Sequence, residues 1–322
     1  MTRMPIAALA LVAATGAFAQ GASSFPTRPV TVVVGFAPGG GTDIAARIIA
    51  KQLTVELGQQ VLVENRAGAG GNIATGAVAR ATPDGYLISL ATISSLTVQP
   101  HLNSKLPYDP RRDLAPLTMG VVFANVLVVH PSVPATTVAE FIALAQAKPG
   151  TIGYGTSGIG TTGHLAGELF RMMAKAPIVH VPYKGGGPAM TDLLGGQIPS
   201  SFASAPSALP HVKAGKIRAL ATTGAARSSF LPDVPTIAES GFPGYEATNW
   251  YAFVAPGKTP KDVVAELNRQ LVKVLSTPSV REQLLSNGME PQPSTPEELA
   301  RYMEREYETW GRVVKEAGIQ AE

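Results

Sequence analysis

The residues best suited to chemistry form a glycine-rich turn near the amino terminus. From Gly35 the chain reads G-x-x-x-x-G-G-T, the pattern of a phosphate-binding loop with Gly41 in the place of its lysine. Without that lysine the loop lacks the cation that reaches the outer phosphates, so a nucleotide site is disfavoured. The turn leads into an expected helix start, where free N–H groups and the helix dipole favour negative charge. The turn therefore suits a carboxylate, and a turn that serves only backbone geometry is the alternative.

A second glycine-rich turn occupies residues 158–163. It reads G-x-G-x-x-G between an expected strand and an expected helix, as in a dinucleotide-binding fingerprint. That fingerprint also needs an acidic residue at the end of the next strand, and residues 178–183 contain none. What remains is a second anion-binding turn with hydroxyl groups at Ser157, Thr161 and Thr162. One turn in each half suggests one carboxylate at residues 37–43 and a second polar or anionic group at these hydroxyls.

Catalytic groups are sparse around the two turns. Ser157 misses the last glycine of the G-x-S-x-G nucleophile motif and has no evident base, so an exported hydrolase using Ser157 is the competing hypothesis. The five histidines lack H-x-x-x-H spacing and the chain has no cysteine, so we expect no metal and no cofactor. His164 is interpreted as structural or as a group that orients a hydroxyl, and Asp43 as a cap of local N–H groups.

The amino terminus has the form of a secretory signal peptide. Arg3 precedes an apolar stretch at residues 6–15, and Ala17-Phe18-Ala19 has the small-x-small form of a cleavage site. The apolar stretch is shorter than the roughly 20 residues that span a bilayer. We expect residues 1–19 to be removed and the mature protein to act in the periplasm. A net charge of +3 without a dense basic cluster gives no indication of nucleic-acid binding.

Strand-like apolar runs alternate with helical patterns, which predicts an α/β fold with largely parallel sheets. The expected strands are residues 30–34, 61–64, 87–92, 126–129, 152–155, 178–181, 219–222 and 250–254. Helices are expected at residues 42–57 and 163–175 and after Thr259 and Thr295, both of which suit N-caps. Two lobes that face each other across a crevice would bring the two glycine-rich turns together.

The chain resembles the Bug family, the extracytoplasmic solute-binding proteins of tripartite tricarboxylate transporters. The resemblance rests on F-A-P-G-G-G-T-D at 36–43, E-N-R-A-G-A-G-G at 64–71, P-D-G-Y at 83–86, V-P-Y-K-G at 181–185 and L-P-D-V-P-T at 231–236. It implies a non-enzymatic, two-lobed periplasmic type II binding-protein fold with two crossing segments and a ligand cleft between the lobes. Residues 26–124 and 251–322 would form lobe 1 and residues 125–250 lobe 2. Membrane permease subunits would be the partners of a monomeric receptor.

The resemblance also implies that ligand carboxylates are held by backbone N–H groups and ordered waters, with the second lobe closing over them. The residues expected to bind ligand are Phe36, Ala37, Gly40, Gly41, Thr42, Asp43, Ser94, Ser157, Gly158, Thr161, Thr162, His164, Tyr183, Ala205, Asn249 and Trp250. Among these, three aromatic residues (Phe36, Tyr183 and Trp250) are expected to form walls, and Gly40 and Gly41 are expected to use the positive φ that glycine tolerates.

The expected ligand is a small organic carboxylate, aliphatic or aromatic, such as terephthalate, citrate or adipate. The family commonly has an acidic residue where this chain has Pro199, which favours a ligand without an amino group. A ligand sensor for a signalling receptor would use the same pocket.

Overall fold

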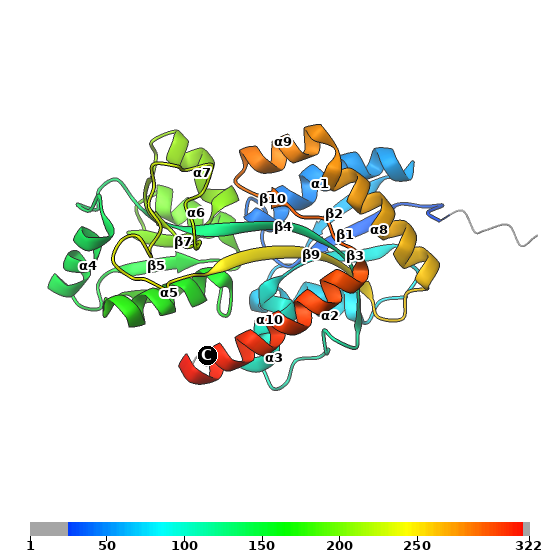
Figure 1. Cartoon of the computed structure of the whole chain (residues 1–322), viewed down its shortest axis with the longest axis horizontal. Helices are drawn as coiled ribbons and strands as arrows, with labels where there is room; N and C mark the ends of the chain where they lie inside the picture. The colour runs from blue at the N-terminus through cyan, green and yellow to red at the C-terminus, as the bar shows by residue number, and fades with distance from the viewer. Residues whose placement is uncertain (1–24, 318–322) are drawn as a thin grey trace, which may run out of the picture.

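The computed structural model describes residues 25–317 and shows two lobes joined by two long strands (Figure 1). The predicted signal peptide, residues 1–19, lies outside the described residues. The crossing strands are β4 (Leu114–Val129) and β9 (Thr248–Pro256), which pair antiparallel through most of the first lobe. Beyond this pairing, β4 continues into the second lobe and pairs there with β7 and β8.

The first lobe is built on three parallel strands. β1 (Val30–Val34) lies between β2 (Val61–Asn65) and β3 (Leu87–Thr92). The other elements of this lobe are α1 (Gly41–Leu57), η1 (Ala69–Gly71), α2 (Asn72–Ala79), η2 (Ser94–Val98), α3 (Gln99–Leu102), α8 (Lys261–Ser276), α9 (Pro278–Ser286), β10 (Glu290–Pro291) and α10 (Pro296–Ala317). The carboxyl-terminal part of the chain thus returns to pack on the lobe that contains the amino-terminal strand (Figure 1).

The second lobe repeats the alternation of strands and helices. Its elements are α4 (Val138–Ala147), β5 (Gly153–Thr156), α5 (Thr162–Ala174), β6 (Val179–Pro182), α6 (Gly186–Leu194), β7 (Ser200–Ser204), α7 (Ala205–Lys213) and β8 (Arg218–Thr222). β5 pairs in parallel with β6 and β7.

The strand order is β2-β1-β3-β9-β4-β7-β5-β6, so the predicted α/β fold is confirmed but the sheet is mixed. Pairs at both ends of this order are parallel, whereas β3–β9, β9–β4 and β4–β7 are antiparallel. The expectation of largely parallel sheets missed the central pairs because β4 and β9 run between the lobes instead of connecting through a helix on one face.

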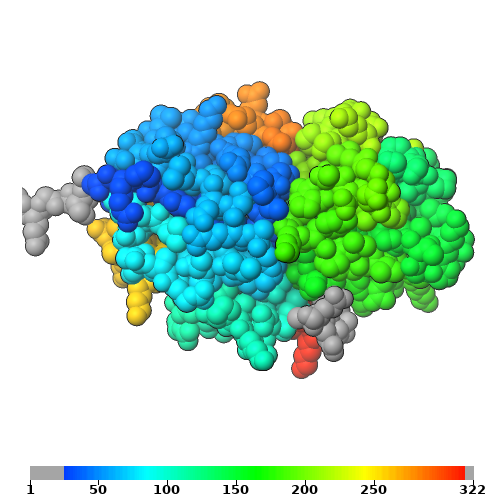
Figure 2. Space-filling model, turned by 180° about the vertical axis from the view of Figure 1, so that it is seen from behind, coloured from blue at the N-terminus to red at the C-terminus, as the bar shows by residue number. Residues whose placement is uncertain are grey.

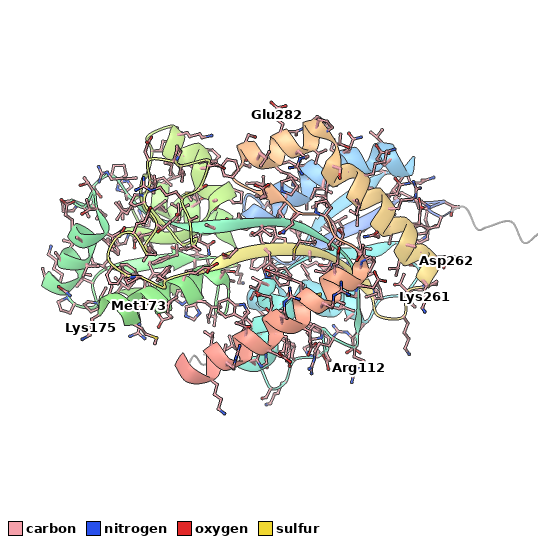
Figure 3. All side chains as sticks on the ribbon, in the orientation of Figure 1. Arg112, Met173, Lys175, Lys261, Asp262 and Glu282 are labelled. Carbon is pink, nitrogen blue, oxygen red and sulfur yellow. The ribbon has the colours of Figure 1, made fainter. Side chains whose placement is uncertain are left out.

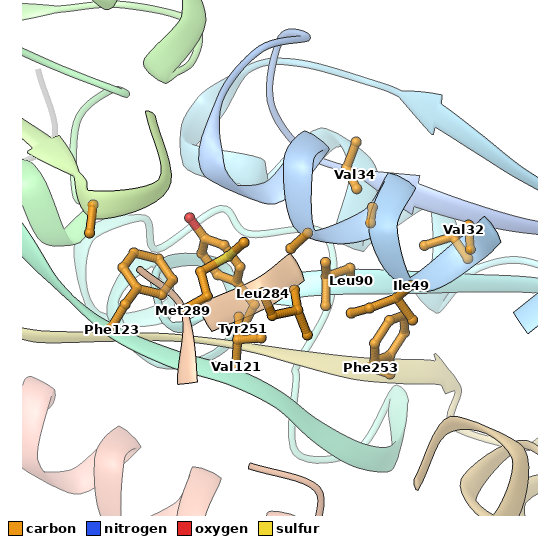
Figure 4. Packing of buried hydrophobic residues seen from close by; sticks show 14 of the residues in the cluster. Val32, Val34, Ile49, Leu90, Val121, Phe123, Tyr251, Phe253, Leu284 and Met289 are labelled. Atoms are coloured by element: carbon orange, nitrogen blue, oxygen red, sulfur yellow. The ribbon is translucent and has the colours of Figure 1, made fainter. Parts of the chain in front are cut away.

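Both faces of the central strands are buried, which explains their nearly continuous apolar sequence. Figure 4 shows Val121 and Phe123 of β4 and Tyr251 and Phe253 of β9 packed in one cluster with Met289 and other residues of the first lobe. The rings of Phe123 and Tyr251 meet edge to face with centroids 4.8 Å apart. This packing fixes the crossing strands at the point where they approach the second lobe.

Local capping signals set several helix limits. α1 ends at Gly58, which has a φ of 61° and so adopts the left-handed conformation that terminates many helices. Thr295 and Glu298 bond reciprocally at the start of α10, as a capping box does. The expected cap at Thr259 is wrong by one residue, because Pro260 takes the N-cap position and the Thr259 hydroxyl bonds to the Pro256 carbonyl. No helix in the described part of the chain is long and apolar enough to cross a membrane.

Candidate ligand-binding site

The amino-terminal ends of four helices converge on a small cavity between the lobes, which we call the inner cavity. They belong to α1 in the first lobe and to α5, α6 and α7 in the second. The inner cavity has a volume of about 30 Å³. It is lined by Phe36, Gly40, Gly41, Thr42, Thr92, Ser94, Asn125, Thr156, Ser157, Thr161, Thr162, Gly163, Gly186, Ala189, Ser201, Phe202, Ala203, Ser204, Asn249 and Tyr251. None of these residues carries a charged side chain.

Free backbone donors border the inner cavity on both sides. The first intrahelical bond of α1 runs from the Ile44 N–H to the Gly40 carbonyl, and that of α5 from the Leu165 N–H to the Thr161 carbonyl. The preceding N–H groups of each helix therefore have no helical partner, and the helix dipoles add positive potential at the same place. Both glycine-rich turns thus border the same cavity between the lobes.

The first turn requires glycine at positions 40 and 41 because neighbouring atoms approach its backbone closely. A Cβ atom on Gly41 would lie 2.8 Å from both the Pro206 side chain and the Tyr251 hydroxyl, and one on Gly40 would lie 3.2 Å from the Gly186 nitrogen. Gly40 has a φ of −86°, so the expectation of positive φ there is wrong; Gly39, with a φ of 82°, makes the left-handed turn. The absence of side chains lets the second lobe approach the α1 terminus.

Asp43 serves the turn and does not line the inner cavity. Its carboxylate accepts hydrogen bonds from the Gly39 N–H at 3.1 Å, the Arg47 guanidinium at 2.9 Å and the Asn65 amide at 3.0 Å. Burial alone would raise the pKa of Asp43, but these hydrogen bonds outweigh it and lower the pKa below the usual value. Asp43 is therefore an ionised brace, and Arg47 neutralises its charge beside the anion-favouring helix end.

Three buried polar atoms at the inner cavity have no partner among the described residues. They are Thr92 Oγ1, Asn125 Nδ2 and Asn249 Oδ1, on residues that are 4%, 1% and 7% exposed. An unsatisfied buried polar group costs roughly 1–3 kcal/mol, and such groups are uncommon in folded proteins. Because all three face one cavity, they point to a polar ligand that bonds to them.

Two stacked histidines hold the second glycine-rich turn on the side away from the inner cavity. The rings of His164 and His180 lie 4.0 Å apart, and His164 Nδ1 accepts the Gly160 N–H at 3.1 Å. The Thr156 hydroxyl, in turn, bonds to His180 Nε2 at 2.7 Å. Burial, and then the proximity of His164, lowers the pKa of His180 to about 3 against an opposing effect of Glu168, so His180 is neutral. The pair fixes the shape of the turn without lining the inner cavity.

Three direct hydrogen bonds between described residues join the lobes beside the two glycine-rich turns. The Ala37 N–H donates to the Lys184 carbonyl at 3.0 Å. The Ser94 hydroxyl donates to the Gly160 carbonyl and the Gln99 amide to the Ile159 carbonyl, both at 2.8 Å. In the space-filling view the two lobes meet along a narrow seam (Figure 2). The structure is therefore a closed arrangement.

The structure distributes the sequence-predicted residues over several places. Those that line the inner cavity are Phe36, Gly40, Gly41, Thr42, Ser94, Ser157, Thr161, Thr162 and Asn249. Gly158 and Tyr183 line a neighbouring space of about 320 Å³, which we call the outer cavity. Ala37 contributes the inter-lobe bond, Ala205 begins α7, and His164 and Asp43 brace the turns.

Trp250 does not line either cavity. Its side chain is fully buried against α10, where Nε1 donates to Glu306 at 3.1 Å and the ring contacts Tyr302. Alternate residues of a strand point to opposite faces, so the neighbouring Tyr251 faces the inner cavity instead. Burial raises the pKa of Tyr251, which keeps its hydroxyl neutral and available as a donor.

Sequence reasoning included Asn249 of β9 but missed other lining residues that lie within strands. Thr92, Asn125 and Tyr251 sit inside apolar runs of β3, β4 and β9, or at their boundary. A single polar residue within an apolar run, such as Asn125 beside Val126, is the signal that could have found them.

Neither a hydrolytic centre nor a metal centre accompanies the inner cavity. Among the hydroxyl groups at the inner cavity, that of Thr156 bonds to a histidine, and no hydrogen bond joins Ser157 to a base within the described residues. Residues 25–317 also contain no group of three histidine or acidic side chains that could hold a metal ion. The two lobes and the polar cavity between them define a solute-binding protein.

Comparisons with known proteins agree with this class. Residues 45–319 match the family described as tripartite tricarboxylate transporter family receptor. The protein BugT of Bordetella pertussis is 38% identical over 99% of this chain and 98% of its own length.

Solved structures share both fold and sequence with the chain. The R. palustris protein Rpa4515 with adipate has a TM-score of 0.89 and 39% identity over 92% of this chain and 99% of that one. The periplasmic binding protein BugD has a TM-score of 0.89 and 34% identity over 92% and 100% of the two chains. MatC from Rhodopseudomonas palustris with bound malate has a TM-score of 0.85 and 32% identity over 90% and 100%.

The chain belongs to the tripartite tricarboxylate transporter receptor family, and the resemblance to the Bug proteins is confirmed. It is a solute-binding protein of two-lobed fold and not an enzyme.

Proposed function

We propose that the protein captures a small organic carboxylate in the periplasm and presents it to the membrane permease subunits of a tripartite transporter. The observation that carries the proposal is the convergence of four helix amino termini on a cavity without charged side chains. Such a site offers N–H and O–H donors to an anion and needs no lysine or arginine.

The unpartnered polar atoms support the same ligand class. The Asn125 amide and the Thr92 hydroxyl can donate to carboxylate oxygens, and Asn249 Oδ1 can accept from a hydroxyl group or a water bound with the ligand. A family neighbour was solved with adipate and another with malate, so dicarboxylates are the first acids to test.

Periplasmic location and transport are part of the proposal. The signal-like residues 1–19 and the family of the chain support them. Cell fractionation followed by amino-terminal sequencing tests the location, and a mature chain beginning at Gln20 is the expected result.

Calorimetry on the purified mature protein tests ligand binding. The ligands are adipate, malate, citrate and terephthalate, each compared with its neutral amide. We expect at least one acid to bind with a Kd in the micromolar range or below and its amide to bind at least tenfold more weakly, because N–H donors to a charged group contribute about 1.5–3 kcal/mol each. Equal binding of acid and amide, or no binding of any acid, would contradict the proposal.

A further inference from the structure

The outer cavity adjoins the inner cavity and is much larger. Its volume is about 320 Å³, compared with about 30 Å³ for the inner cavity. Phe36 and Ser157 line both cavities, so the two spaces lie against each other. Residues 68–70 and Asn103 line the outer cavity from the first lobe, and residues 157–159 and 182–184 line it from the second. Like the inner cavity, it is completed by the closure of the lobes.

The size of the inner cavity limits which part of a ligand it holds. A volume of about 30 Å³ accommodates about two water-sized groups, which corresponds to the two oxygens of one carboxylate. The carbon frame of a larger acid therefore needs neighbouring space, and the outer cavity provides it.

The walls of the outer cavity suit a carbon frame. Phe36, Ile159 and the ring of Tyr183 supply apolar surface. The Tyr183 hydroxyl donates to Asp192 at 2.7 Å, which fixes the ring in place. Burial, followed by this bond to Asp192, raises the pKa of Tyr183 to about 12, so the wall stays uncharged.

One cation borders the outer cavity. Lys184 is the only lining residue of either cavity with a charged side chain. Within residues 25–317 no acidic side chain lies within 4 Å of its ammonium group. Its carbonyl accepts the Ala37 N–H at 3.0 Å, so closure of the lobes places this residue beside the first turn. The closed state thus holds the backbone of Lys184, and its exposed ammonium group is available to an anion in the outer cavity.

A strained turn shapes the opposite rim of the outer cavity. Gly68, Ala69, Gly70 and Gly71 all have positive φ, and Ala69 at 49° does so without being glycine. For Ala69 this left-handed conformation costs about 1–3 kcal/mol, and strained residues of this kind are found preferentially at functional sites. The strain is consistent with a rim whose shape matters to the ligand.

We propose that the outer cavity is a tail subsite in which the carbon frame of the ligand lies between Phe36 and Tyr183 and a second anionic group lies beside Lys184. The preferred ligands are then diacids with a spacer long enough to leave the inner cavity, such as adipate, suberate or terephthalate. This inference rests on the proposed function, because it assumes that the inner cavity holds the first carboxylate.

The test is calorimetry at low salt with succinate, adipate, suberate and hexanoate. The proteins are wild type, Lys184→Gln and the matched control Lys175→Gln. Lys175 is an exposed lysine of the same lobe and lies at its outer end, away from the seam (Figure 3). A further variant, Asn103→Asp, adds a negative charge to the outer cavity with almost no change of shape.

For the wild type we expect adipate and suberate to bind about tenfold tighter than hexanoate and succinate. Lys184→Gln should lower the affinity for adipate about fivefold and leave hexanoate within twofold, because an exposed ion pair contributes about 1 kcal/mol at most. Asn103→Asp should weaken adipate more than hexanoate, and Lys175→Gln should change neither. The salt dependence of adipate binding should decrease in Lys184→Gln.

Two results would overturn the tail subsite while leaving the proposed function intact. One is unchanged adipate binding in Lys184→Gln and Asn103→Asp. The other is an equal loss for adipate and hexanoate, which would mean that Lys184 acts on closure. If no carboxylate binds the wild type, the proposed function itself fails.

Discussion

Acidification should destabilise the folded protein through His180, a partly buried histidine. His180 stacks on His164 at 4.0 Å, lies 5.2 Å from the ring of Tyr154, and bonds to Thr156. The charged groups nearby are Glu168 and, bonded to it, Arg171. Burial and His164 lower the pKa of His180 from 6.5 to about 3.

The direction in which stability changes with pH follows from comparing proton binding in the folded and unfolded chains. Between pH 6.5 and 3 the unfolded chain binds a proton at His180 that the folded chain does not, so stability falls as the pH falls. Each pH unit in this window costs about 1.4 kcal/mol. From pH 7.5 to 4.5 His180 should therefore account for a loss of about 2–3 kcal/mol.

The assay is urea unfolding followed by far-ultraviolet circular dichroism at pH 7.5, 6.5, 5.5 and 4.5. Because carboxylates also titrate, wild type is compared with His180→Gln, which removes the partly buried imidazole. The variant should be less stable at pH 7.5, where it loses the bond to Thr156, but its stability should fall by about 2–3 kcal/mol less on acidification. His130→Gln, at an exposed histidine bonded to Ser132, is the control. Parallel curves for wild type and His180→Gln would refute the reasoning.

Three further outcomes follow from the inner cavity. Gly40→Val should weaken ligand binding at least tenfold with the fold intact, because the valine side chain would meet the Gly186 nitrogen. Normal affinity by calorimetry would show that the turn is not part of the binding site. Asn125→Ala should lower ligand affinity about tenfold without lowering the urea midpoint of the ligand-free protein, because Asn125 Nδ2 has no partner to lose. A large drop in that midpoint would show that Asn125 has a structural role. Dialysis against a chelator should leave the calorimetric affinity unchanged, because the described residues offer no metal-binding cluster, and lost binding would contradict this.

The sequence predicted the elements better than it predicted the site. The strands at residues 30–34 and 87–92 match the structure to the residue, because apolar runs bounded by turn residues mark buried strands. The helix after Gly40 also ends where expected, since Gly58 supplies the left-handed cap. These are local features, and local sequence determines them.

The site depends on how distant segments meet. Trp250 and Tyr251 could not be told apart by pattern, because β9 is buried on both faces and shows no alternation of polar and apolar residues. The inner cavity exists only where the first turn approaches α5, α6 and α7, which no local pattern specifies. That the two glycine-rich turns meet at one cavity follows from the sequence only once two facing lobes are assumed.

The proposed site for the first carboxylate uses main-chain atoms at helix ends, and this has a consequence for how such receptors diverge. A substitution away from the turn glycines changes a side chain but leaves the N–H groups of α1 and α5 in place, so the main-chain part of the proposed site persists through such changes. Residues that line the outer cavity outside the motifs shared with the family, such as Asn103 and Ile159, can change without altering those N–H groups. Duplicated copies of such a gene could therefore acquire new acids by a few substitutions at the tail end, without a period in which they bind no acid at all.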